Sequence, residues 1–168
     1  DMEGSRGLGD VYKRQEEDLQ KLSNDIFMYY GLGCRSVSKI YLPKDYDLDI
    51  LFKQVYSWKD IINNSSYYNN YTYNKTIYLM SEEKFFDNGF LILKESTEIG
   101  SPIGAVFFEY YENDNTVIKS LKKYSEKIQC IVGKNIVENS VEFGNTQRPS
   151  LDDFADKINT LDFLLKLS

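Results

Sequence analysis

The apolar positions along the chain predict helices and strands in alternation from Glu16 onward. Residues 16–30 carry apolar side chains at helical spacing, and Gly31 gives this helix a C-terminal stop. Residues 37–42 have the pattern of a strand that ends at a proline. The next helix is capped by Asp45 or Asp47. Its apolar positions are Leu48, Leu51, Phe52, Val55, Trp58 and Ile62.

Three apolar runs in the second half of the chain predict further strands. Residues 90–93 follow an Asp-Asn-Gly turn, and residues 105–111 form a second strong run. A polar break at residues 113–115 can cap a helix, after which residues 128–132 form a short apolar strand. Because this strand–helix–strand spacing suits parallel pairing, we expect an α/β fold with a mostly parallel sheet flanked by helices.

The remaining segments have weaker patterns. Residues 63–74 are predicted to be a polar, tyrosine-rich connection, and residues 75–84 a short helix. A last helix is predicted near the end of the chain, and its apolar side should dock on the sheet. The residues on that side are Leu151, Phe154, Ala155, Ile158, Leu161, Leu164 and Leu165.

Residues 1–15 show neither helical nor strand periodicity, so we expect a non-native or disordered leader there. Residues 7–15 resemble a translated sequencing-adaptor remnant of the kind found at the ends of metagenomic reading frames. On this interpretation residues 16–168 are the native part, and the protein is truncated at its N-terminus.

Composition and charge narrow the class of partners. The 168-residue chain is 42% hydrophobic, which is enough for the core of one domain. Its net charge of −6 disfavours nucleic acid and anionic membranes as partners. No apolar run approaches the roughly 20 residues that a membrane helix needs, so we expect no membrane span.

The chain contains two cysteines, Cys34 and Cys130, and no histidine. Because it has neither a Cys-x-x-Cys pair nor a histidine, we expect no metal site and no disulfide framework. This cysteine usage also predicts a reducing, cytoplasmic compartment. Cys-His and Ser-His catalytic pairs are also excluded, so any base must be Glu, Asp, Lys, Tyr or water. Cys130 lies inside an apolar run and is expected to be an inert core cysteine.

Cys34 is the strongest candidate for chemistry because it follows Gly31-Leu32-Gly33. Glycines let the chain turn sharply and approach a ligand closely, which leaves backbone amides free beside the thiol. A helix that began here, helped by Arg35, would favour the thiolate, and the same amides could hold an oxyanion. The alternative is a buried structural cysteine beside an ordinary turn.

Three segments carry a family resemblance: residues 25–43 (DIFMYYGLGCRSVSKIYLP), 69–75 (NNYTYNK) and 101–104 (SPIG). In this order they resemble the catalytic part of acyl-CoA reductases related to the bacterial bioluminescence fatty-acid reductase (LuxC type), which belong to the aldehyde dehydrogenase superfamily. With the stretches between and after them, the resemblance covers residues 16–168. It implies the three-layer α/β catalytic domain of that superfamily.

The resemblance also assigns roles to two residues. Cys34 matches the nucleophile, with a small residue before it and Lys39 five places after it. Residues 98–103 (EIGSPI) look like the superfamily's Glu-Ile-Phe-Gly-Pro-Val segment, in which Glu98 would contact the ribose of the cofactor; Gly100 stands in place of phenylalanine. The implied reaction is attack of Cys34 on an acyl-CoA, release of CoA, and hydride transfer from NADPH to give an aldehyde.

The superfamily's cofactor-binding domain, glutamate base and side-chain oxyanion donor all precede the cysteine and are not matched here. The resemblance therefore implies a catalytic-domain fragment that can accept an acyl group on Cys34 without completing the reduction.

The oligomeric state stays open, with a homo-oligomer of the intact protein as one option. Two other functions also stay open: a non-catalytic interaction domain whose Tyr/Asn patch binds a partner, and an NAD(P)-dependent aldehyde dehydrogenase.

Overall fold

The fold is built on a four-stranded, mostly parallel sheet. Its strands are β1 (Lys39–Pro43), β2 (Phe86–Asp87), β3 (Ile92–Glu95) and β4 (Ala105–Tyr111). Their order is β1-β4-β3-β2; β1 and β3 pair in parallel with the central β4, and β2 pairs antiparallel with β3. The structure is a computed structural model that describes residues 6–133, 137, 140–151, 153–154 and 159–166.

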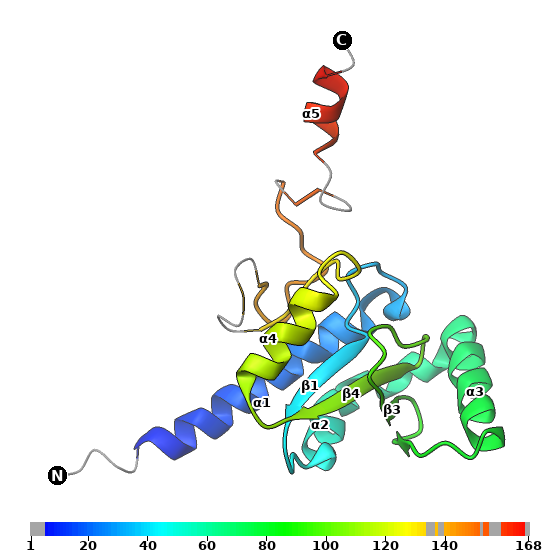
Figure 1. The fold of residues 1–168 in the computed structure, drawn as a ribbon. Coiled ribbons are helices and arrows are strands. Elements are labelled where there is room, and N and C mark those ends of the chain that lie inside the picture. Colours follow the sequence, from blue (N-terminus) through cyan, green and yellow to red (C-terminus); the bar gives the residue numbers. More distant parts are fainter. Residues whose placement is uncertain (1–5, 134–136, 138–139, 152, 155–158, 167–168) are drawn as a thin grey trace.

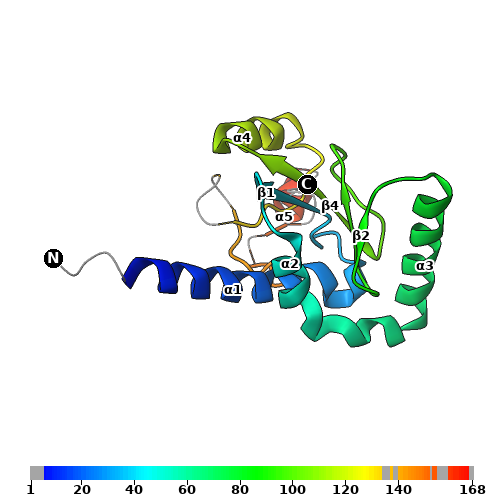
Figure 2. The same cartoon turned by 90° about the horizontal axis from the view of Figure 1, so that it is seen from below.

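Helices cover both faces of this sheet. The helices are α1 (Arg6–Phe27), α2 (Leu48–Val55), α3 (Ser65–Met80) and α4 (Asp114–Lys123), with 3₁₀ segments η1 (Met28–Gly31) and η2 (Tyr56–Asn63). A further helix, α5 (Thr160–Leu165), lies near the C-terminus and covers neither face. Figure 2 shows α4 on one face, α1 and α2 on the other, and α3 beyond β2. The predicted α/β class with a mostly parallel sheet is therefore confirmed (Figure 1).

Most of the strongly patterned elements were predicted correctly. The predicted strand at 105–111 coincides with β4, while β1 and β3 each begin two residues later than predicted. Ile92, Leu93 and Val106 are almost fully buried, as expected for apolar strands covered on both faces. Asp47, not Asp45, caps α2: its carboxylate accepts a hydrogen bond from the backbone N–H of Asp49 at 2.9 Å.

The connection predicted at 63–74 is wrong, because these residues begin the long helix α3. Asparagine and tyrosine are poor helix formers, but burial of tyrosine side chains overrides that preference. Tyr67, Tyr71 and Tyr78 are buried, and the hydroxyl of Tyr71 donates to Asp87 at 2.7 Å. The Asn74 side chain donates to the carbonyl of Ile103, outside the helix, at 3.0 Å. Tertiary contacts therefore stabilise this helix.

The strand predicted at 128–132 is also wrong. Within the described part of the chain, this segment makes only one isolated bridge, between Val132 and Val141. Its backbone forms no hydrogen bonds with β1, although both segments line one cavity. The sheet therefore ends at β1, whose outer edge is left free for the site described below.

The two ends of the chain differ from expectation as well. α1 begins at Arg6 rather than at Glu16, so residues 6–15 are helical; their non-native origin stays a prediction. Of the described residues in the predicted C-terminal helix, only those of α5 form a helix. Residues 152 and 155–158 of that prediction lie outside the residues that the structure describes. Leu151 is 99% exposed and Leu165 is 72% exposed. The predicted docking on the sheet is therefore wrong, and Figure 1 shows α5 standing away from it.

Among the residues that the structure describes, no helix has both the length and the apolar character needed to cross a membrane.

Candidate functional site

Cys34 lies in the loop between η1 and β1, and its side chain is exposed. The backbone N–H of Ser36 donates to the carbonyl of Gly33 at 2.9 Å, so the thiol lies within a tight turn. No helix begins at this point, which removes the helix N-terminus that we considered as a source of thiolate stabilisation. The turn does hold the thiol at the surface, as a nucleophile requires, and this excludes the fully buried cysteine of the alternative.

The residues just before this turn have an unusual backbone. Tyr29, Tyr30 and Gly31 all have positive φ angles, of 55°, 60° and 71°. Glycine adopts this left-handed region freely, but other residues lose about 1–2 kcal/mol there. Such strain is found most often next to functional sites and persists only where the surrounding contacts enforce it. The side chains of both tyrosines are exposed.

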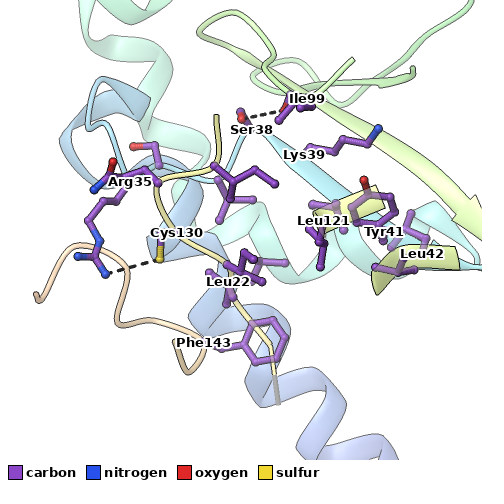
Figure 3. Close-up of a pocket in the computed structure, with 18 of the residues that line it drawn as sticks. Leu22, Arg35, Ser38, Lys39, Tyr41, Leu42, Ile99, Leu121, Cys130 and Phe143 are labelled. Atoms are coloured by element: carbon purple, nitrogen blue, oxygen red, sulfur yellow. Dashed lines mark hydrogen bonds between the residues drawn. The ribbon is translucent and has the colours of Figure 1, made fainter. Parts of the chain in front are cut away.

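Cys34 lines two cavities. The larger, of about 450 Å³, reaches from Cys34 along the free edge of β1 to α1 and α4 (Figure 3). Its walls include Leu22 of α1, Leu121 of α4, Cys130 and Phe143. A volume of this size falls within the range of pockets that hold small organic ligands, about 300–1,000 Å³. The mostly apolar walls suit a hydrocarbon chain.

The edge of β1 that faces this cavity has free backbone groups. The Ser38 carbonyl accepts from the N–H of Phe107 at 3.0 Å, which points the backbone polar groups of the even-numbered residues toward β4. The backbone groups of Lys39 and Tyr41 consequently point away from β4. A ligand with amide groups can therefore bond to this edge while its apolar part occupies the cavity.

The smaller cavity, of about 210 Å³, joins Cys34 to the segment at residues 101–104. The Ser38 hydroxyl donates to the carbonyl of Ile99 at 3.3 Å and holds the two segments together (Figure 3). Helix α3 fixes the other side, because the Asn74 side chain donates to the Ile103 carbonyl at 3.0 Å. The structure thus brings together all three segments that carry the family resemblance.

Glu98 does not join this arrangement. Its side chain is exposed, and it belongs to the lining of neither cavity that Cys34 lines. Its backbone N–H donates to the Ser96 hydroxyl at 3.1 Å. The charge of Glu98 acts on Tyr78, a residue of α3. Burial is the main cause that raises the pKa of Tyr78, and the charges of Glu83 and Glu98 raise it further. Glu98 is therefore placed toward α3 rather than beside the thiol.

Arg35 and Cys130 contact each other rather than Cys34. The guanidinium of Arg35 lies 3.6 Å from the Cys130 sulfur (Figure 3). It also lies 3.2 Å from the Asp153 carboxylate. Burial raises the pKa of Cys130, and Arg35 offsets only part of that effect. A raised pKa keeps this sulfur in the thiol form at neutral pH. Cys130 is half-buried and lines the larger cavity, so the predicted core position is wrong, and its lack of reactivity stays a prediction.

Lys39 forms a structural ion pair. Its ammonium group lies 2.6 Å from the Glu109 carboxylate on the neighbouring strand and donates to the Ser96 carbonyl at 3.1 Å. The Lys39 side chain is only 7% exposed, so the pair fixes the register of β1 against β4 just beyond the Cys34 loop.

Sequence reasoning missed the residues that hold the loop in place. The Asp25 carboxylate is 1% exposed and accepts hydrogen bonds from the backbone N–H groups of Gly144 and Thr146 and from the Thr146 hydroxyl. The next residue, Gln147, donates from its amide to the Ser36 hydroxyl at 3.3 Å. Their only signal in the sequence was the position of Asp25 within the resembling segment 25–43.

Neither a scan against protein-family models nor searches of curated proteins and of solved structures match this chain. The function is therefore argued from the geometry of the Cys34 site.

Proposed function

We propose that Cys34 accepts an acyl group from an acyl-CoA thioester, the first half of an acyl-CoA reductase reaction. The Cys34 thiolate attacks the thioester carbonyl carbon, so that a new carbon–sulfur bond forms and the bond to the CoA sulfur breaks. CoA leaves as a thiolate and takes up the proton that Cys34 released. One thioester replaces another, so the step needs no external reagent.

The observation that carries this proposal is the position of Cys34 at the mouth of two cavities. An exposed thiol is within reach of a large substrate such as CoA, and the larger cavity offers apolar walls for the acyl chain. The smaller cavity lies against residues 101–104, the segment that resembles the cofactor side of the aldehyde dehydrogenase site. In a catalytic domain of the aldehyde dehydrogenase type, the larger cavity would hold the acyl chain and the smaller one would face the cofactor.

The chemistry also suits a site without histidine. A thiolate is a strong nucleophile and CoA is a good leaving group, so acyl transfer between thiols needs little acid–base assistance. Hydrolysis of an ester or an amide would need a general base beside the nucleophile. Within the described residues the smaller cavity is lined by no carboxylate or lysine, and the hydroxyl of its Tyr67 donates to the Phe90 carbonyl. The larger cavity includes Asp18, Lys39 and Lys127 in its lining, and the Lys39 ammonium is paired with Glu109.

The residues present do not by themselves fit NADPH. The cavity of about 210 Å³ beside residues 101–104 is below the range that holds a drug-sized ligand, and Glu98 lies outside it. We therefore limit the proposal to acyl transfer onto Cys34. The reduction to an aldehyde stays an expectation from the family resemblance, in which most of the NADPH site belongs to a separate domain.

A single-turnover assay tests the proposal. Chromatography should detect about one equivalent of free CoA for each chain after mixing with a long-chain acyl-CoA. Cys34→Ser should release none, whereas Cys130→Ser, the same change at the other thiol, should release as much as the wild type. Equal CoA release from Cys34→Ser and the wild type would contradict the proposal.

A further inference from the structure

The side chain of Gln147 contacts the turn on both sides of Cys34. Its Nε2 group donates to the Ser36 hydroxyl at 3.3 Å. On the other side the amide lies against Gly33: a Cβ atom added to that glycine would lie 2.9 Å from both Nε2 and Oε1. A side chain at position 33 would therefore displace the Gln147 amide from the turn.

The loop that carries Gln147 is anchored by Asp25 at the end of α1. The Asp25 carboxylate accepts from the Gly144 N–H at 2.7 Å and from the Thr146 hydroxyl at 2.8 Å. The backbone carbonyl of Asp25 accepts from the N–H of Val37 at 3.0 Å, which fixes the chain just after the turn. One residue at the end of α1 thus fixes both the Gln147 loop and the exit from the Cys34 turn.

Asp25 and Thr146 are both buried, so these hydrogen bonds are shielded from water and hold the loop firmly. Gln147 follows Thr146 directly, so the backbone from which its side chain reaches the turn is fixed. A side chain held in this way can keep a neighbouring nucleophile at the distance and angle that its reaction needs.

We propose that Gln147 is a positioning residue for Cys34: it holds the Gly33–Ser36 turn so that the thiol faces the cavity mouths. The inference rests on the proposed function of Cys34 as an acyl acceptor. Gln147 acts through Gly33 and Ser36, and no contact with substrate is assigned to it.

The test compares Gln147→Ala with Arg148→Ala, a matched change at the exposed neighbouring residue. Iodoacetamide alkylation of Cys34 is measured by peptide mass spectrometry, with Cys130 of the same molecules as the internal reference. We expect Gln147→Ala to raise the Cys34 alkylation rate threefold or more, because the turn opens to a small reagent. The Cys130 rate should stay within twofold, and Arg148→Ala should match the wild type at both thiols.

Acylation by a long-chain acyl-CoA should change in the opposite direction in Gln147→Ala, falling about tenfold because the thiol is no longer aligned. General loosening of the fold would raise alkylation at both cysteines together, and that result would overturn the inference, as would an unchanged Cys34 rate. If the wild-type chain accepts no acyl group, the proposed function fails, and the alkylation comparison still decides the role of Gln147.

Discussion

The carboxylate of Asp25 accepts two hydrogen bonds from Thr146, one from its backbone N–H at 3.1 Å and one from its hydroxyl at 2.8 Å. Both residues are buried, and 121 positions of sequence separate them. This pair joins the end of α1 to the loop behind Cys34. The turn that carries Cys34 is therefore linked to a contact between segments far apart in the sequence.

The first prediction concerns the stability of this contact. Asp25→Ala leaves three donor groups without an acceptor, two of them buried, and should lower the free energy of unfolding by about 3 kcal/mol. Thr146→Val removes only the hydroxyl bond and should cost about 1–2 kcal/mol. Glu17→Ala, an exposed change on the same helix, should stay within about 0.5 kcal/mol of the wild type. Urea unfolding curves give all three values, and a loss of less than 0.5 kcal/mol for Asp25→Ala would refute the anchoring role.

The second prediction compares two glycines that both have positive φ. A Cβ atom at Gly104 would lie 2.8 Å from the Cα of Tyr71, whereas one at Gly89 would meet nothing within 4 Å. Gly89→Ala should cost only the backbone strain, about 1–2 kcal/mol. Gly104→Ala must also push α3 away from the site and should be the more destabilising by 2 kcal/mol or more, on the order of other overpacked substitutions. Equal melting temperatures for the two variants would show that α3 does not pack on residues 101–104 as described.

The third prediction concerns alkaline pH. Burial, together with the hydrogen bond and the charge of Asp87, raises the pKa of Tyr71 from 10.0 to about 12. Because the phenol ionises more readily in the unfolded chain, its stabilising contribution is complete below pH 10 and is lost as the pH rises toward 12. Tyr71→Phe should therefore lose stability less steeply than the wild type over this interval. Urea midpoints measured at several alkaline pH values supply both slopes, and parallel slopes would contradict the assignment.

The fourth prediction concerns the acyl chain. If the larger cavity holds this chain, each methylene that enters it gains about 0.8 kcal/mol, or roughly fourfold in acylation efficiency. Leu121→Trp should fill part of the cavity, because Leu121 lines it from α4 (Figure 3). The variant should acylate more slowly with long-chain donors and as fast as the wild type with acetyl-CoA. An equal loss with both donors would show that the chain binds elsewhere.

The sequence predicted the parts of this fold that depend on local apolar patterns. β4 and the cap at Asp47 follow from patterns of a few residues, which is why they were found. The parallel pairs that form, β1 with β4 and β3 with β4, differ from the pair expected between residues 105–111 and 128–132. α3 was missed because its tyrosines stabilise it through distant partners: the Tyr67 hydroxyl donates to the Phe90 carbonyl, 23 positions away. The segment at 128–132 has a strand's composition, yet it lies across a cavity from β1 instead of pairing with it.

The candidate site also combines residues that a local pattern reveals with residues that depend on distant contacts. Cys34 was recognised from its glycines, which are a local signal. The contacts of Asp25 and Gln147 with distant residues leave no pattern in a single sequence, since each joins segments more than a hundred positions apart. Glu98 was taken from a motif, and only the folded chain shows that it lies outside both cavities.

The most direct test of the account is the mass of the intact chain after incubation with an acyl-CoA, followed by mapping of the modified peptide. The account predicts a single acyl adduct that maps to Cys34, is lost on treatment with hydroxylamine, and is absent from Cys34→Ser. An adduct on Cys130 instead, or a folded chain that stays unmodified by donors of every length, would contradict the central claim that Cys34 is an acyl-accepting nucleophile.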